Sequence, residues 1–155
     1  MNSERDQVCE SIYRYGLGID TRDWQLYRSI FTDAIDMDFS SYSGQPGGRM
    51  SADEWVNGCK ILFMGLDATQ HTMTNPIVDI AGDRATCKMY MQAAHFLKND
   101  MGDDEFTLGG YYDDRLIRTA DGWQIEAVTL TVLWNRGNRH IMELAAGIGA
   151  KRLSA

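Results

Sequence analysis

The chain has 155 residues, a formal net charge of −7 and a pI near 4.8. This length suits one domain with a sizeable core, and an apolar fraction of 44% is a globular value that excludes a disordered chain. Because phosphate binding needs a basic face, the acidic balance argues against nucleic acid and anionic membranes as partners.

Residues 3–20 have the pattern of an amphipathic helix. Ser3 is a good N-cap, and apolar residues then recur at spacings of three and four. Gly16 and Gly18 weaken the last turn, so we expect the helix to fray before Asp20. Asp20 would then lie between two helices and point at whatever they cover.

The next segment combines short elements. Thr21 is the expected cap of a short second helix, and residues 34–39 alternate apolar and acidic side chains as a half-buried strand does. Residues 40–49 are rich in glycine and are expected to form a flexible loop. Ser51 opens a capping box for a further helix that ends near Gly65.

From residue 69 onward the apolar periodicity changes from helical to alternating. The predicted strands are residues 69–78, 85–97, 106–118 and 123–134. Pro76 must lie at a bulge, an edge or a strand end, Gly109 and Gly110 indicate a bend, and a change of apolar parity near Ala127 indicates a bulge. Residues 141–148 are expected to form a helix that covers a pocket.

Helices followed by a long antiparallel meander predict one α+β domain over residues 1–155. The bulges and the bend expected at Pro76, at Gly109 and Gly110 and near Ala127 predict a strongly curved antiparallel sheet with the N-terminal helices packed on it. Such a sheet encloses a cavity, and cavities of this kind are the usual ligand sites.

Location and assembly follow from composition. No segment approaches the roughly eighteen apolar residues of a membrane span, and the N-terminus has no apolar signal core. An odd number of cysteines without CxxC spacing favours reduced thiols, so we expect a cytoplasmic protein. Apolar side chains on the expected outer sheet face, Tyr90, Val132 and Trp134, predict a homo-oligomer, a dimer or a trimer.

Asp20, His71 and His95 carry the strongest functional signal. His71 and His95 fall in half-buried strands, and His95 lies on the apolar face of its strand. A carboxylate with one or two such histidines is a common general acid/base set. The alternatives are a hydrogen-bonded core histidine, a helix cap at Asp20, and a metal site built from all three side chains.

The order of these elements and residues resembles the nuclear-transport-factor-2-like superfamily, particularly its SnoaL-like members. Asp-Gly-Trp-Gln-Ile at 121–125 is similar to the superfamily's C-terminal strand. The placement of Asp20, His71 and His95 is similar to scytalone dehydratase, and hexachlorocyclohexane dehydrochlorinase shares the Asp and the first His. The resemblance covers residues from about 5 to 135 and implies a cone-shaped α+β barrel.

One departure concerns tyrosines. Scytalone dehydratase uses tyrosines to position a water and polarise the substrate carbonyl, whereas Ile19 precedes the Asp in this chain. Tyr42, Tyr111 or Tyr112 could take that role, and the sequence does not choose between them. The same substrate is therefore not implied, even where the type of chemistry is.

The resemblance and the residues together predict a cofactor-independent lyase of the dehydratase type. His71 would remove a proton, Asp20 would orient His71, and His95 would donate a hydrogen bond or proton to the departing hydroxyl or the carbonyl oxygen. The expected substrate is a small hydroxylated cyclic or polyketide-like carbonyl compound, with no metal and no cofactor. The residues expected to contact it are Tyr15, Trp24, Tyr42, Met73, Met91 and Tyr112.

Two other classes of function stay open. An isomerase or polyketide cyclase could use the same pocket, with Asp36 or Asp38 as an inward base of the ketosteroid isomerase type. A non-catalytic protein, either a small-molecule binder or a subunit like the β subunit of ring-hydroxylating dioxygenases, would not need Asp20 to approach His71.

Overall fold

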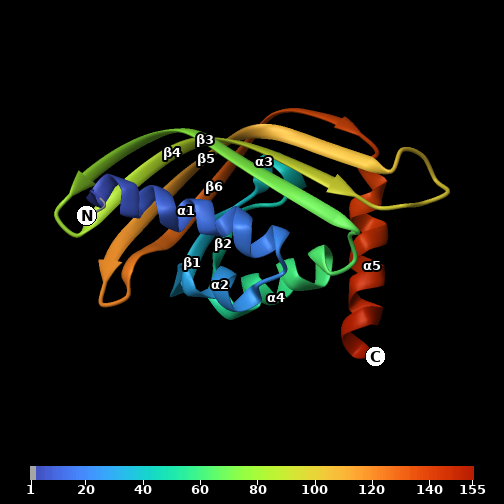
Figure 1. Cartoon of the computed structure of the whole chain (residues 1–155), viewed down its shortest axis with the longest axis horizontal. Helices are drawn as coiled ribbons and strands as arrows, with labels where there is room; N and C mark the ends of the chain where they lie inside the picture. The colour runs from blue at the N-terminus through green and yellow to red at the C-terminus, as the bar shows by residue number, and fades with distance from the viewer. Residues whose placement is uncertain (1–2) are drawn as a thin grey trace.

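The structure is a computed structural model that describes residues 3–155, and it has helices packed against the concave face of a curved sheet (Figure 1). The helices are α1 (Glu4–Asp20), α2 (Trp24–Ser29), α3 (Ser40–Ser43), α4 (Ala52–Phe63) and α5 (His140–Ser154). The strands are β1 (Phe31–Asp38), β2 (Gly48–Ser51), β3 (Ala68–Ala81), β4 (Arg84–Phe96), β5 (Glu105–Thr119) and β6 (Gly122–Gly137). The predicted α+β class is confirmed, while residues 1–2 of the expected domain lie outside the described part.

The six strands form one sheet in the order β2-β1-β6-β5-β4-β3. All neighbours pair antiparallel except β1 and β6, which run parallel, so the sheet is mixed and the purely antiparallel expectation was wrong at this pair. Within residues 3–155 the outer strands β2 and β3 do not pair with each other. The sheet therefore curves like part of a barrel without closing into one.

The irregularities predicted to curve the sheet are present as shifts in strand register. The pairing of β3 with β4 shifts register between Thr74 and Ile77, around Pro76. A second shift lies at Gly109 and Gly110 in β5, and a third lies in β6 just before Ala127. Because each bulge increases local twist and bend, the sheet wraps around the helices instead of lying flat.

Helix α1 reaches Asp20 without fraying, contrary to expectation. Ser3 caps it through a capping box, as predicted. A Cβ at Gly16 would lie 2.9 Å from the His71 Cβ, and one at Gly18 would lie 2.9 Å from the Tyr27 Cβ. These glycines allow α1 to approach β3 and α2 closely, and this tertiary packing outweighs their low helix propensity.

The cap of α2 also differs from the prediction. The Asp23 carboxylate accepts a hydrogen bond from the Leu26 amide at 2.9 Å, so Asp23 is the N-cap. Thr21 instead ends α1, and its hydroxyl donates to the Leu17 carbonyl at 2.7 Å.

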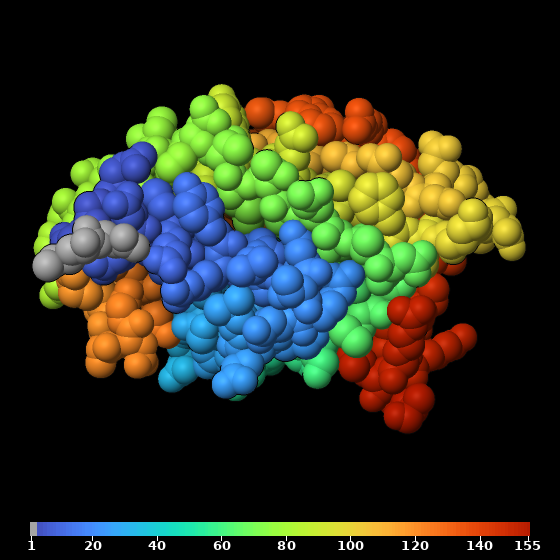
Figure 2. Space-filling model, in the orientation of Figure 1, coloured from blue at the N-terminus to red at the C-terminus, as the bar shows by residue number. Residues whose placement is uncertain are grey.

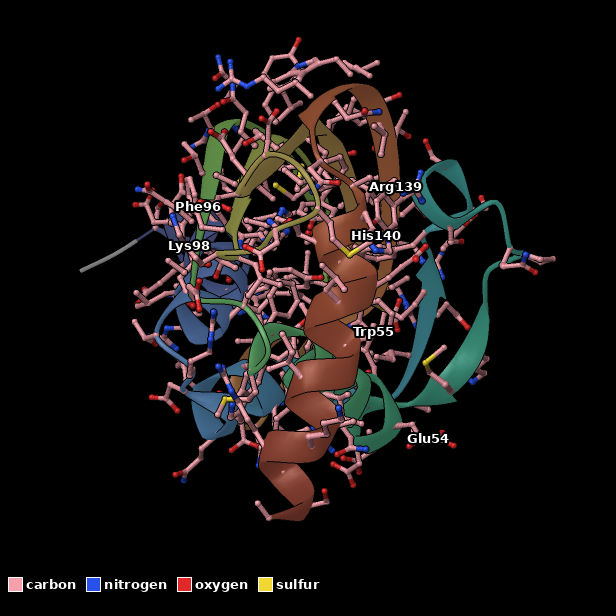
Figure 3. The ribbon with its side chains drawn as sticks, turned by 90° about the vertical axis from the view of Figure 1, so that its right-hand side faces the viewer. Glu54, Trp55, Phe96, Lys98, Arg139 and His140 are labelled. Atoms are coloured by element: carbon pink, nitrogen blue, oxygen red, sulfur yellow. The ribbon has the colours of Figure 1, made fainter. Side chains whose placement is uncertain are left out.

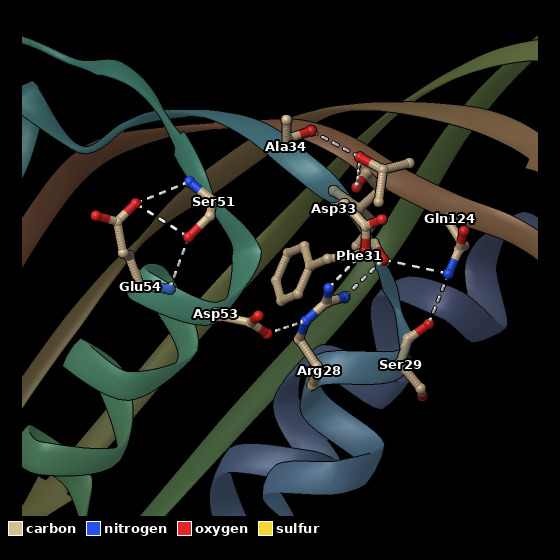
Figure 4. Close-up of polar contacts among 11 residues, drawn as sticks. Arg28, Ser29, Phe31, Asp33, Ala34, Ser51, Asp53, Glu54 and Gln124 are labelled. Carbon is tan, nitrogen blue, oxygen red and sulfur yellow. Dashed lines mark hydrogen bonds and ion pairs between the residues drawn. The ribbon is translucent and has the colours of Figure 1, made fainter.

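The segment expected to be a loop contains α3 and β2, and β2 pairs antiparallel with β1. Elements this short have too few residues to show a period, which is why the sequence pattern missed them. The capping box of Ser51 with Glu54 is confirmed (Figure 4). Beside it, the Arg28 guanidinium joins α2 to Asp33 in β1 and Asp53 in α4, each at 2.7 Å (Figure 4).

Helices α1 and α2 (blue) lie at the left and centre of the face seen in Figure 2, below the strands (green to orange). Helix α5 is longer than expected and runs along one end of the molecule, with His140 in its first turn (Figure 3). It packs against α4 at Gly65 and Gly149, where backbones meet so closely that a Cβ would overlap a carbonyl oxygen. Cys9 and Cys87 are buried, Cys59 is half-buried, and all are free thiols. No helix in residues 3–155 is long and apolar enough to cross a membrane.

Candidate active site

A cavity of about 250 Å³ lies between the concave face of the sheet and helices α1, α4 and α5. Its lining is mainly aromatic and aliphatic, with His71 and His95 as the nitrogen-bearing side chains other than an indole. The full lining is Tyr15, Ile19, Phe39, Tyr42, Trp55, Cys59, Leu62, Phe63, His71, Met91, Ala93, His95, Leu108, Tyr112, Leu130 and Met142. The expected pocket is therefore present, and it contains both expected histidines.

Asp20 and His71 are brought together, as predicted, by the end of α1 and the start of β3. The His71 Nδ1 lies 2.8 Å from Asp20 Oδ1, and the His71 backbone amide donates to Oδ2 at 2.6 Å. The Thr69 hydroxyl lies 2.9 Å from Oδ1. The His71 side chain is 4% exposed and that of Asp20 is 18% exposed, so water has little access to the pair.

The proton positions in this pair follow from its contacts. Burial raises the pKa of Asp20, but hydrogen bonds from His71 and Thr69 and the attraction to His71 outweigh it, so the pKa is lowered overall. An ionised carboxylate only accepts, so His71 Nδ1 carries a hydrogen. In the neutral ring Nε2 then has the lone pair, which is the form that a general base needs.

His95 is held differently. Its Nδ1 lies 3.0 Å from the Phe106 carbonyl oxygen, and because a carbonyl only accepts, Nδ1 carries the hydrogen. Burial, together with the nearby His71, lowers the pKa of His95 to about 4. At neutral pH the ring is uncharged and its Nε2 is an acceptor. The neutral ring therefore cannot donate to a leaving group, contrary to the expectation from the sequence.

The tyrosines supply the hydroxyl donors of the cavity. Tyr15, Tyr42 and Tyr112 line it, as expected. Burial raises the pKa of Tyr15 and of Tyr112, so both stay protonated; the Tyr15 hydroxyl donates to that of Tyr27, whereas Tyr112 can donate to an oxygen in the cavity. Their ring centroids are 5.4 Å apart, and the Tyr15 ring is 6.5 Å from that of His71. Tyr111 instead packs under Lys88 away from the cavity.

Of the other expected contact residues, Met91 lines the cavity, whereas Trp24 and Met73 do not. Trp24 instead packs edge-on against Tyr27 and is partly buried against the core. Met73 lies beneath Gly16 of α1, because the absent Cβ leaves room for its side chain. Position in an apolar pattern does not reveal which core residues border a void.

The acidic residues of β1 do not enter the cavity. Asp36 forms ion pairs with Arg49 and Arg115 at 3.3 Å, and Asp38 accepts from the Ser40 amide at 2.9 Å. Among residues 3–155, no group of three or more His, Cys, Asp or Glu side chains is placed to hold a metal ion.

Several site residues were missed by the sequence reasoning. Phe63 from α4 packs against both imidazoles, with its ring centroid 5.8 Å from His71 and 6.0 Å from His95, whose own centroids are 6.1 Å apart. Trp55 donates from Nε1 to the Tyr27 hydroxyl at 3.0 Å. Both were recognised only as one apolar helix face, and Met142 of α5 showed no signal beyond its place in an apolar segment.

Comparisons with known proteins concern the family and the fold of the chain. A family model described as a SnoaL-like domain matches residues 2–129. The Terrestric acid biosynthesis cluster protein E of Penicillium crustosum is 28% identical over 145 residues, covering 88% of this chain and 87% of that protein.

Solved structures give the same fold. The Kfla4162 protein of Kribbella flavida is 30% identical with a TM-score of 0.84, covering 92% of this chain and 96% of that one. A proposed scytalone dehydratase from Novosphingobium aromaticivorans is 14% identical with a TM-score of 0.75, covering 86% and 87%. At that identity the likeness concerns the fold alone.

Proposed function

Because the chain belongs to the SnoaL-like domain family, we propose that it is a lyase that eliminates water from a small hydroxylated carbonyl compound without a cofactor. The observation that carries the proposal is the Asp20–His71 pair, in which Asp20 holds the His71 Nδ1 while the His71 side chain borders an apolar cavity. A relative whose name places it in a biosynthesis cluster, and a structural neighbour described as a dehydratase, are consistent with it.

The proposed reaction balances with the residues present. His71 Nε2 takes a proton from the carbon next to the carbonyl, and the electron pair of that C–H bond becomes the new C=C bond. The β C–O bond breaks, and the His71 imidazolium returns the proton to the departing hydroxyl, so water leaves and the base is regenerated. Asp20 stabilises the imidazolium between these steps, and the cavity's low polarity strengthens that interaction.

Tyr112 is the proposed donor to the substrate carbonyl oxygen. Negative charge develops on that oxygen as the C–H proton leaves, so a hydrogen bond directed at it lowers the barrier. His95 Nε2, as an acceptor, would hold the hydrogen of a substrate hydroxyl and so orient the ring.

The cavity limits the substrate class. At about 250 Å³ it lies just below the roughly 300–1,000 Å³ of sites for drug-sized ligands, so the substrate is small. The aromatic lining favours a flat cyclic compound, and no lysine or arginine lines the cavity to pair with an anionic group. An uncharged cyclic or polyketide-like β-hydroxy ketone fits these limits.

The test is a turnover screen of aromatic and alicyclic β-hydroxy ketones, with water loss followed by the absorbance of the enone product. Asp20→Asn and His71→Gln are each expected to lower kcat by about 10²- to 10⁴-fold, the usual contribution of a general base. His140→Gln is the matched control, because that histidine lies on α5 with its side chain 40% exposed, and its ring contacts Glu143 and not the cavity.

Circular dichroism would confirm that each variant is folded. A wild-type protein that binds these ketones without turning them over would favour the small-molecule-binding alternative. Full activity in Asp20→Asn and His71→Gln would refute the proposed base.

A further inference from the structure

Arg22 has a backbone conformation that arginine rarely adopts. Its φ is +58°, in the left-handed region where the Cβ of an L-residue meets the following carbonyl oxygen. Asn75 is the other non-glycine residue of the described chain with a positive φ, and asparagine tolerates this region well. Strain of this kind persists only where the surroundings impose it, and it is concentrated at functional sites.

The Arg22 side chain reaches the Asp20–His71 pair through Thr69. Arg22 Nη1 donates to the Ile19 carbonyl at 2.6 Å and lies 2.8 Å from Thr69 Oγ1. A guanidinium only donates, so the Thr69 oxygen must be the acceptor in this contact. The single hydroxyl hydrogen of Thr69 is then left for Asp20 Oδ1, 2.9 Å away.

This chain of contacts determines how the Asp20 carboxylate is held. Oδ1 receives the Thr69 hydroxyl and the His71 ring, while Oδ2 receives the His71 amide. In each of these contacts a carboxylate oxygen accepts a hydrogen bond, and in none of them would the carboxyl group have to donate one. They also fix the rotation of the carboxylate so that Oδ1 faces His71 Nδ1.

The charge of Arg22 is placed to support this arrangement. The guanidinium carbon lies 6.0 Å from the centre of the Phe63 ring, and Phe63 borders both imidazoles. Burial lowers the pKa of Arg22 and the charge of Asp20 opposes that effect. A half-buried cation at this position favours the ionised form of Asp20.

We propose that Arg22 is a positioning residue for the candidate active site, and that its strained backbone places the guanidinium so that Thr69 donates to Asp20 and Asp20 accepts from His71. The inference rests on the proposed function, since Asp20 and His71 are the pair that it positions. Neither Arg22 nor Thr69 lines the cavity, so both act through Asp20.

The first measurement needs no substrate. The carboxyl ¹³C signal of Asp20, assigned by its loss in Asp20→Asn, is followed against pH in wild type, Arg22→Gly, Thr69→Val and Thr69→Ser. Arg22→Gly is expected to move the titration to higher pH, because a cation that favours the ionised form of Asp20 is lost. We expect the Asp20 titration to move to higher pH in Thr69→Val, because a hydrogen bond to the ionised form is lost. Thr69→Ser restores the hydroxyl and is expected to restore the wild-type titration.

The second measurement separates positioning from a structural role. Glycine adopts a φ of +58° freely, so Arg22→Gly is expected to leave the melting temperature unchanged or raised. The same variant is expected to lower kcat roughly ten- to a hundredfold through misplacement of the pair, with KM changed less than about twofold. Thr69→Val should lower kcat similarly, and Thr69→Ser should recover most of it.

An unmoved Asp20 titration in Thr69→Val would overturn the inference, and so would an Arg22→Gly variant that loses stability and rate together. The two readouts also distinguish this inference from the proposed function. If the titration moves but no ketone is turned over, Arg22 positions Asp20 and the elimination chemistry is wrong. If elimination depends on His71 while the titration stays in place, only the role of Arg22 is wrong.

Discussion

At the scale of single residues, burial decides which titratable groups are charged. Asp114 in β5 is 3% exposed, and its Oδ1 has no hydrogen-bond partner among the described residues. Burial, and to a lesser extent the nearby Asp113, raises the pKa of Asp114 well above its usual value. Burial likewise lowers the pKa of His95, so at both groups burial favours the uncharged form.

Asp114→Asn is expected to stabilise the protein at neutral pH. The folded pKa of Asp114 is above the unfolded value, so the folded state binds the proton more tightly, and the free energy of unfolding falls as pH rises above the unfolded pKa near 3.8. Asparagine has the shape of the aspartate side chain and cannot ionise. The free energy of unfolding of Asp114→Asn is therefore expected to exceed that of wild type by on the order of 1–3 kcal/mol at pH 7, and by nothing below about pH 4. Urea unfolding at several pH values measures it.

Asp113→Asn is the matched control for that series. Asp113 is the neighbour in the same strand, with a side chain 46% exposed and paired with Lys88 at 3.3 Å. Its replacement should change stability by less than about 1 kcal/mol at pH 7, as for other exposed ion pairs. Equal pH dependence in wild type and Asp114→Asn would contradict the buried neutral carboxyl.

At the scale of elements, the cavity depends on how α5 meets α4. Met142 of α5 lines the cavity, so the position of α5 helps to set the cavity's shape. Small residues make this contact close: Gly65 meets the backbone of Ala145, and Gly149 meets the Ile61 carbonyl. Neither glycine has a positive φ, so the requirement is for space and not for an unusual conformation.

Gly149→Ala is expected to lower the free energy of unfolding by about 1–3 kcal/mol, because the added Cβ would overlap the Ile61 carbonyl oxygen and force the helices apart. Gly147→Ala lies in the same helix with open space around it, so it is expected to be neutral or to stabilise by up to about 1 kcal/mol. Thermal melts of the two variants give the comparison. A Gly149→Ala variant as stable as Gly147→Ala would show that the α4–α5 contact is looser than described.

At the scale of the whole molecule, the outer face of the sheet has a pair of exposed apolar side chains that lie together. Ile77 is 72% exposed and Tyr90 is 55% exposed, and the two border one shallow depression on neighbouring strands. Exposed apolar side chains that are grouped in this way are typical of surfaces that bind other proteins.

We therefore propose that the self-association expected from the sequence occurs through this face. Sedimentation should give an assembly larger than the 17.5 kDa monomer, and Tyr90→Lys should shift it toward the monomer. Leu17→Lys is the control, because Leu17 is also 55% exposed but lies on α1. A monomeric wild type, or equal effects of the two substitutions, would rule out this face.

The sequence by itself determined the order of the long elements, the capping boxes and the curvature of the sheet. These features depend on local chemistry: Ser3 and Ser51 cap their own helices, Pro76 interrupts the pairing of its own strand, and Gly109 and Gly110 lie where β6 bulges opposite them. The sequence also predicted that Asp20 and His71 act together, because the family that it resembles has an Asp and a His at similar places in the order of elements. The short strand β2 and the parallel pairing of β1 with β6 had no local signal.

The tertiary structure alone decided what each side chain at the site can do. The role of His95 depends on the Phe106 carbonyl across the strand pair, and that of Arg22 depends on Thr69, 47 positions away. Which apolar residues border the cavity, as Met91 does and Met73 does not, depends on where α1 lies over the sheet. Proton positions and voids are set by contacts between segments far apart in the chain, and a local pattern contains no information on those contacts.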